Sequence, residues 1–290
     1  MRPVISRRLL LAGAVGGAAA LTLPVRADDA VHRRLAQLEH DHGRILGLWA
    51  LDTGSGQRLA YRADRRFAFC SAFKVVLAGA ILHRHQTEPG LLERHVHYDA
   101  TTLVTYSPIT ERHLETGLRV ADLCAAALQY SDNTAANLLL AQVGGPAGVT
   151  AFARRLGDAV FRLDRDEPTL NTALPDDPRD TTTPLAMGMT LQRLLLGEAL
   201  AVEGRRQLQT WLEGNTTGAT RIQAGVPTDW RVGDKTGTGD YGVANDVGIV
   251  WPPDRAPWIV AVFTRGPDPS SPGDSALIAA AMREVVQVWG

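Results

Sequence analysis

Strand-like segments stand near both ends of this chain, with helical sequence between them. Near the N-terminus, two apolar runs at 45–51 and 57–61 flank a Gly-rich turn, which is the pattern of a β-hairpin. Because strands must lie side by side to pair, strand segments so far apart in sequence predict one sheet assembled from the two chain ends. The later strand-like runs are 230–236, 243–251 and 258–264.

The middle of the chain reads as a separate helical part. It is rich in Ala and Leu, and Gly and Pro divide it into helix-length stretches. We expect an α/β subdomain from 28–62 and 213–290 and an all-α subdomain from 63–212, with a ligand cleft between them. A long loop at 162–184 exceeds most connections, and such loops are often functional. The expected helices are 30–43, 119–129, 134–142, 146–156, 184–196, 203–213 and 274–288.

Residues 1–27 read as an export signal. Two adjacent arginines, Arg7 and Arg8, precede an Ala/Gly/Leu stretch, and Ala27 offers a small-residue cleavage site, which suggests Tat export to the periplasm. A retained N-terminal anchor is the alternative, and the acidic start at Asp28 disfavours it. Removing the segment deletes four arginines and no acid, so the net charge falls from −1 to −5, which argues against a nucleic-acid partner. No later apolar run reaches membrane-spanning length.

Ser71 and Lys74 open a long apolar run, 75–82. A spacing of three is nearly one helical turn, so on a helix the hydroxyl and the amine share a face, with Ser71 at the helix start, where negative charge is favoured. That is a workable setting for a nucleophilic hydroxyl with an adjacent base. An N-cap serine followed by an exposed lysine would give the same pattern.

Lysine usage favours the catalytic interpretation. Of the 30 cationic residues only Lys74 and Lys235 are lysine, and the others are arginine. Lysine can lose its proton when it is buried, whereas arginine effectively cannot. Lys74 also lies among Phe73, Val75 and Val76, which are poor neighbours for a solvated charge.

Three further clusters could carry chemistry, and each has a simpler explanation. Residues 130–134 (YSDNT) could be a helix start, since Ser, Asp and Asn are good caps. Residues 165–171 (RDEPTLN), inside the long loop, could be a solvated acidic turn. Residues 235–239 (KTGTG) could be an edge strand with a charged guard residue.

Several other site types are disfavoured. All eight histidines lie between His32 and His113 without a His-Glu-x-x-His pair, so a zinc site or a Ser-His-Asp triad is not expected. The glycines of 237–242 match a dinucleotide-binding pattern, but a strand-like segment follows them instead of a helix. Cys70 and Cys124 could form a disulfide, although we expect two buried thiols.

Taken together and in this order, Ser71-x-x-Lys74, Ser131-Asp132-Asn133 and Lys235-Thr236-Gly237 are the three motifs of serine β-lactamases and penicillin-binding proteins. The Glu167…Asn171 pair resembles class A β-lactamases in particular. The chain is similar to the CTX-M-like branch along nearly its whole mature length. Stretches that carry this similarity are 125–130, 143–147, 161–165, 214–218 and 251–252.

The resemblance implies a fold and a set of roles. The fold is an antiparallel sheet from both chain ends flanked by helices, with a helical domain inserted and the active site in the cleft between. Ser71 would attack the β-lactam carbonyl, with its own N–H and that of Thr238 as oxyanion hole. Lys74 and Glu167 compete as acylation base. Ser131 would pass a proton to the departing ring nitrogen, and Glu167 and Asn171 would hold the hydrolytic water. Asn133 would bind the acylamide side chain, and Tyr106 would line the cleft mouth. The substrate carboxylate would be received by Lys235, Thr236 and Thr238, with Gly237 as a further substrate-binding residue.

Two details refine what the resemblance implies. A second cation normally helps to bind the substrate carboxylate; we expect Arg221 in this role, with Arg265 as the alternative. Arg165 and Asp180 would pair across the long loop. Carbapenem-hydrolysing relatives pair a cysteine such as Cys70 with a second one where this chain has Gly239, so we expect weak carbapenem turnover.

Other functions remain as alternatives. A penicillin-binding DD-peptidase shares the three motifs but would deacylate slowly. A non-catalytic β-lactam sensor would normally be attached to a membrane segment or a signalling partner. The resemblance implies a monomeric enzyme that confers antibiotic resistance, without metal or cofactor, whose partner is a small β-lactam.

Overall fold

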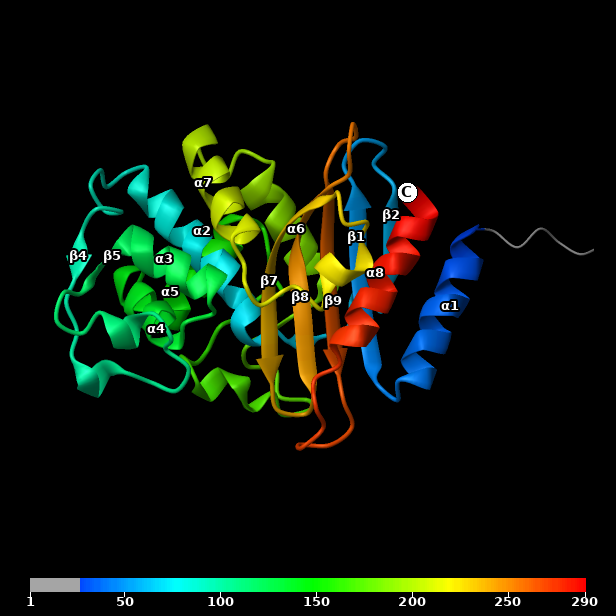
Figure 1. The fold of residues 1–290 in the computed structure, drawn as a ribbon, viewed down its shortest axis with the longest axis horizontal. Coiled ribbons are helices and arrows are strands. Elements are labelled where there is room, and N and C mark those ends of the chain that lie inside the picture. The colour runs from blue at the N-terminus through cyan, green and yellow to red at the C-terminus, as the bar shows by residue number, and fades with distance from the viewer. Residues whose placement is uncertain (1–26) are drawn as a thin grey trace, which may run out of the picture.

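The computed structural model describes residues 27–290 and is built around one five-stranded antiparallel sheet (Figure 1). The strand order is β2-β1-β9-β8-β7, so strands from the N-terminal hairpin pair with strands from the end of the chain. This is the sheet expected from the two chain ends. The strands are β1 (Ile45–Asp52), β2 (Arg58–Tyr61), β7 (Arg231–Gly239), β8 (Val243–Trp251) and β9 (Trp258–Arg265).

Successive side chains of a strand point to opposite faces of the sheet, and here apolar side chains lie on both faces. On β1, Leu46 and Leu48 join a core with α1 (Ala27–Asp41) and α8 (Ser275–Trp289), which lie together on one side in Figure 1. Trp49, also on β1, joins the larger core with the helices on the other side. A sheet covered on both faces explains why its strands read as nearly continuous apolar runs.

The helical part surrounds α2 (Lys74–His85), whose residues 74–82 are all buried. A helix that is apolar on every side is stable only at the centre of other helices. Its first turn follows a short 3-10 turn, η1 (Cys70–Phe73), which contacts β7. The helices around it are α3 (Val120–Gln129), α4 (Asn133–Gln142), α5 (Gly145–Arg155), α6 (Pro184–Leu195) and α7 (Val202–Glu213).

The segments outside the main helices carry short elements. The long loop, expected without structure of its own, contains the 3-10 turn η4 (Thr169–Thr172) and strand β6 (Thr181–Thr182), which pairs with β3 (Phe67–Ala68). That pairing fixes the exit of the loop next to the entry to η1. The other short elements are β4 (His95–Val96), β5 (Leu118–Arg119), η2 (Ala100–Thr102), η3 (Thr110–Arg112) and η5 (Ile222–Gly225).

Within residues 27–290, no helix is both long and apolar enough to cross a membrane. Apart from Ala27, where α1 begins, the expected export segment lies outside the described residues.

Helix α6 packs directly on the sheet, although the sequence placed it with the helical part. Gly188 permits this approach, because a Cβ there would lie 2.0 Å from Cε3 of the buried Trp49. We therefore expect Gly188→Ala to lower the free energy of unfolding by about 1–3 kcal/mol, since rigid aromatic carbon would have to move. Chemical denaturation measures the change.

Gly204→Ala, which also replaces a helical glycine with alanine, is the matched control. Gly204 lies in α7, and a Cβ there would meet only ordinary contacts, 3.6 Å from Leu200 Cβ. Alanine should leave stability unchanged or raise it by up to ~1 kcal/mol. Equal effects of the two substitutions would contradict the packing argument.

Candidate active site

Ser71 lies in the η1 turn, and its hydroxyl points at the long loop. Ser71 Oγ donates a 2.9 Å hydrogen bond to Glu167 Oε1, although the two residues are 96 positions apart. Cys70 before it has φ +46°, so the backbone enters the turn in the left-handed region. Phe69 and Phe73 are the caps of η1 and α2, so the N-cap interpretation of Ser71 is wrong.

Lys74 is completely buried at the start of α2. Its ammonium donates to Ser131 O at 2.8 Å and to Asn133 Oδ1 at 2.7 Å, and it lies 3.0 Å from Glu167 Oε1. Burial lowers the pKa of Lys74, and the adjacent Glu167 carboxylate opposes that shift. The alternative of an exposed lysine is therefore wrong.

Glu167 is buried and held from several directions. Asn171 Nδ2 donates to its Oε2 at 2.5 Å, one helical turn further along the loop. Asn137 of α4 grips the backbone, because its side-chain oxygen accepts from Glu167 N and its nitrogen donates to Glu167 O, at 3.0 and 2.8 Å. Asn137 was not predicted from the sequence, where it reads as an ordinary polar helix residue.

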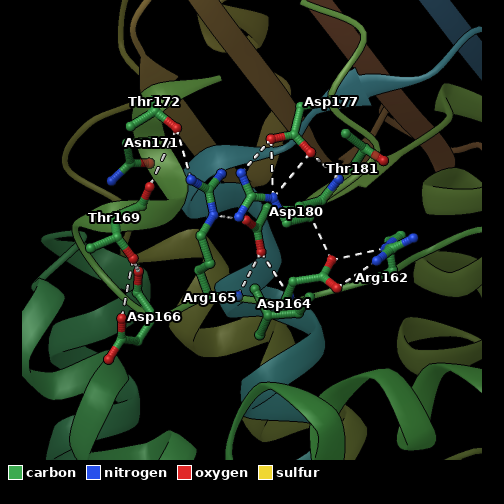
Figure 2. Close-up of polar contacts among 12 residues, drawn as sticks. Arg162, Asp164, Arg165, Asp166, Thr169, Asn171, Thr172, Asp177, Asp180 and Thr181 are labelled. Carbon is green, nitrogen blue, oxygen red and sulfur yellow. Dashed lines mark hydrogen bonds and ion pairs between the residues drawn. The ribbon is translucent and has the colours of Figure 1, made fainter. Parts of the chain in front are cut away.

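The expected pair of Arg165 and Asp180 closes the long loop (Figure 2). Arg165 Nε donates to Asp180 Oδ2 at 2.6 Å, and the other carboxylate oxygen accepts from the backbone N–H groups of Asp164 and Arg165. Arg165 also donates to Thr172 Oγ1. Asp180 therefore fixes the entry and the exit of the loop that carries Glu167.

Ser131 and Lys235 face each other from the two structural parts. Lys235 Nζ donates to Ser131 Oγ at 3.1 Å and to Thr236 O at 2.9 Å. Burial lowers the pKa of Lys235 to about 7, and the nearby Lys74 ammonium adds to the shift. β7 is an edge strand, but Lys235 is fully buried there, so it is not a solvated guard residue.

Asp132 combines structural roles at the same corner. It is the N-cap of α4, accepting from Ala135 N, and it also accepts from the backbone of Ile109 and Thr110. The helix-start interpretation of 130–134 is thus correct for Asp132. Through these bonds Asp132 fixes the backbone that carries its neighbours Ser131 and Asn133.

A cleft of about 370 Å³ brings these side chains together. β7 forms one wall; it approaches η1 closely, because a Cβ on Gly237 would lie 2.4 Å from Phe69 O. Exposed Tyr106 stands at the opposite wall. The lining residues are Ser71, Tyr106, Ser131, Asn133, Asn171, Thr217, Arg221, Thr236 and Thr238.

Arg221 reaches the cleft from behind β7. Its Nη1 donates to Gly237 O and Asn245 O, and its Nη2 donates to Thr238 Oγ1 at 2.7 Å. Arg265, the alternative cation, lines a different cavity beside Arg65 and Ala173. Geometry therefore favours Arg221.

Two further residues support β7, and sequence reasoning missed both. Thr217 Oγ1 lies 2.5 Å from Thr236 Oγ1 and lines the cleft. Asn245 of β8 donates from its side chain to Ala68 O and Phe69 O, tying the sheet to the residues just before Ser71. An asparagine inside an apolar strand run was the available signal.

A carboxylate pair lies behind Lys235. Asp234 Oδ2 and Asp246 Oδ1 are buried without a hydrogen-bond partner among the described residues. Burial, together with the Asp234 charge, raises the pKa of Asp246 well above its ordinary value. Across residues 27–290, no group of three His, Cys, Asp or Glu side chains could hold a metal ion.

Comparison with known proteins gives concordant matches. A family model described as "Beta-lactamase enzyme family" matches residues 30–289. The carbapenem-hydrolyzing beta-lactamase KPC of Klebsiella oxytoca is 51% identical over 285 residues, covering 98% of this chain and 97% of that protein. Beta-lactamase CTX-M-8 of Citrobacter amalonaticus is 52% identical over 263 residues, covering 91% and 90%. A beta-lactamase crystal structure from Desulfarculus baarsii superposes with a TM-score of 0.90 at 56% identity, covering 91% and 98%.

Both cysteines are free and buried, as expected. Burial raises the pKa of each thiol, so little thiolate is present at neutral pH. We expect a chromogenic disulfide reagent to react with neither cysteine in the native protein and with both after denaturation. Thr210→Cys, at an exposed position of α7, should react within minutes and is the control. Rapid native labelling of the unmodified chain would contradict the burial.

Proposed function

This chain belongs to the beta-lactamase enzyme family, as a class A serine β-lactamase, and from that premise we propose that it opens the β-lactam amide of penicillins and cephalosporins through an ester on Ser71. The observation that carries the proposal is one shared atom. Glu167 Oε1 lies 2.9 Å from Ser71 Oγ and 3.0 Å from Lys74 Nζ. A nucleophile, a carboxylate and an ammonium thus meet at one buried point.

Acylation begins when the Ser71 hydroxyl loses its proton to a base and attacks the carbonyl carbon. The three N–H donors of the Lys74 ammonium have three acceptors, so in this arrangement it has no lone pair to offer. Glu167 already accepts from the hydroxyl. This supports Glu167 as base, while Lys74 would act only after losing a proton, which removal of the Glu167 carboxylate would favour because that carboxylate raises the pKa of Lys74.

The developing oxyanion would be held by the N–H groups of Ser71 and Thr238. The close approach of β7 to η1 at Gly237 supports this assignment, because it brings the two backbones to one edge of the cleft. One such donor is worth ~10²–10³ in rate.

The departing ring nitrogen needs a proton, and Ser131 is placed to supply it. Lys235 donates to Ser131 Oγ, so the hydroxyl's own hydrogen is available for the leaving nitrogen. Replacement of that proton through Lys235 or Lys74 is consistent with the lowered pKa of both amines.

Deacylation requires a water between the ester and a base. Glu167 would activate it, and Asn171 would orient it, since Asn171 Oδ1 is buried without a partner among residues 27–290. Ser71 Oγ and Glu167 Oε1 are 2.9 Å apart, so one water can lie within hydrogen-bond reach of both. Acylation removes the hydroxyl hydrogen that Glu167 accepts, so the carboxylate can then accept a hydrogen bond from the water.

Substrate binding divides between the walls of the cleft. Thr236, Thr238 and the ammonium of Lys235 would receive the carboxylate, and Arg221 would add charge behind Thr238. Gly237 would present backbone to the substrate. On the opposite wall, Asn133 and Tyr106 would contact the acylamide side chain.

The same premise extends to the whole protein. We propose export to the periplasm with cleavage near Ala27, action as a monomer, and subdomains at 28–62 with 213–290 and at 63–212. Carbapenem turnover should be weak, since Gly239 stands beside Cys70 Sγ where a second cysteine would be needed.

Glu167→Ala tests the hydrolytic step. With a chromogenic cephalosporin, the parent enzyme should turn over continuously, whereas the variant should give one stoichiometric burst and then hydrolyse about 10²–10⁴-fold more slowly, because the water loses its base. Rapid-mixing absorbance and intact mass measure the burst and the trapped acyl-enzyme. Glu115→Ala, which removes an exposed carboxylate, is the control. A burst from the unmodified protein would instead favour the DD-peptidase or sensor alternative.

Arg221→Ala tests the carboxylate site. We expect KM for benzylpenicillin to rise about 10–100-fold, the value of a charge-assisted hydrogen bond, with a smaller change in kcat. Arg265→Ala removes the same charge at the other cavity and should leave KM unchanged. Steady-state kinetics, with melting temperatures to check folding, decide between them. Unchanged KM in a folded Arg221 variant would remove the assignment.

A further inference from the structure

A cavity of about 470 Å³ lies away from the reaction cleft, which measures about 370 Å³. One side is helix α6, and the other is the segment 157–160, which leads into the long loop. Asp64 and Arg66 form the rim. The mechanism uses none of these residues.

The cavity is apolar over most of its length. Ala186, Met189 and Arg193 follow one face of α6 at spacings of three and four, so two small or flexible apolar side chains lead to one cation. Val160 faces them from the opposite segment, and Leu185 completes the apolar wall. Such a wall accommodates a hydrocarbon or aryl body.

Arg193 is half-buried, and its guanidinium has N–H donors available to a ligand. Within residues 27–290 it has no ion pair and donates no side-chain hydrogen bond. A Cβ built on Gly157 would lie 3.7 Å from Cζ and from both terminal nitrogens of Arg193, so the guanidinium lies flat against that glycine. The N–H donors of a guanidinium lie in its plane, so those of Arg193 point sideways and not toward Gly157. An anion beside the edge of the guanidinium could accept hydrogen bonds from them.

The charges of the cavity lining sum to zero, two arginines against two aspartates, but the groups differ in how far the protein already occupies their hydrogen bonds. Arg66 uses only Nη1, which donates to Val160 O and Thr181 Oγ1. The buried carboxylate of Asp158 accepts hydrogen bonds from Val160 N, Phe161 N and Thr190 Oγ1. Asp64 is exposed at the rim and is the one carboxylate without such partners. Both guanidinium groups thus keep N–H donors available to a ligand, whereas the Asp158 carboxylate is already held by the protein and Asp64 is solvated.

We propose that this cavity binds a small amphipathic carboxylate, an apolar body ending in one anionic group. The apolar wall would take the body, and Arg193, with Arg66 beyond it, would take the carboxylate in a bidentate or bridging mode. A neutral apolar molecule would leave the guanidinium unpaired, and a small hydrophilic anion would leave the wall uncovered. Lipid-derived acids fit this description, and a hydrolysed penicillin, with an aryl body and two carboxylates, is the nearest alternative.

Met189 provides a local reporter, because the chain has only four methionines and Met189 alone among them lines the cavity. The full chain carrying methyl-labelled methionine is titrated with octanoate, and the methyl signals are followed by NMR. We expect the Met189 signal to move saturably while that of Met282, a buried residue of α8, stays still. Acetate should have no effect, and 1-octanol should bind at least tenfold more weakly. Hydrolysed benzylpenicillin, run in parallel, separates the two sources, since the compound that moves Met189 identifies its own class.

Arg193→Gln should weaken octanoate binding about tenfold or more, by loss of a charge-assisted pair. Arg206→Gln, on the exposed side of α7, should bind as the parent does. The inference is overturned if neither acid moves Met189, if octanol binds as tightly as octanoate, or if the Arg193 variant binds unchanged. Because the readout is binding at Met189, the result is independent of whether the proposed hydrolysis occurs.

Discussion

The buried contact between Lys74 and Glu167 is the constraint on which the rest of the site depends. Both side chains are completely buried, with Nζ and Oε1 3.0 Å apart. Burying two charges is costly, and removing one partner of such a pair typically costs ~3–5 kcal/mol because the other is left unpaired. The surrounding fold must therefore supply a partner for every remaining donor and acceptor of the pair.

Each partner comes from a different element, which explains why the site needs the whole fold. Lys74 is the first residue of α2, Asn133 is the first residue of α4, and Glu167 lies in the long loop. Asp180 holds both ends of that loop, and Asn137 fixes its backbone at Glu167. The same side chains that compensate buried charge thus aim a carboxylate at a hydroxyl, so stability and reactivity have one physical origin.

The sequence predicted the strands, the main helices and the convergence of the three motifs, because apolar periodicity and residue chemistry are local signals. It did not predict Asn137 or Asn245, since a polar side chain that grips backbone from another element has no local pattern. It left Arg221 and Arg265 open for the same reason: only the packing of the segment before η5 behind β7 decides which guanidinium reaches Thr238. The direct contact of Ser71 with Glu167 likewise depends on how a loop folds back over 96 residues.

The two lysines of this chain are both fully buried, so residues 27–290 expose no side-chain amine to solvent. Strained lactams acylate free amines as well as hydroxyls, and an ordinary protein surface offers many of them. Here the positive charges of the exterior are guanidinium groups, which stay protonated and are poor nucleophiles. An acylating drug that diffuses over this surface therefore meets no lysine that it could modify at random before it reaches the cleft.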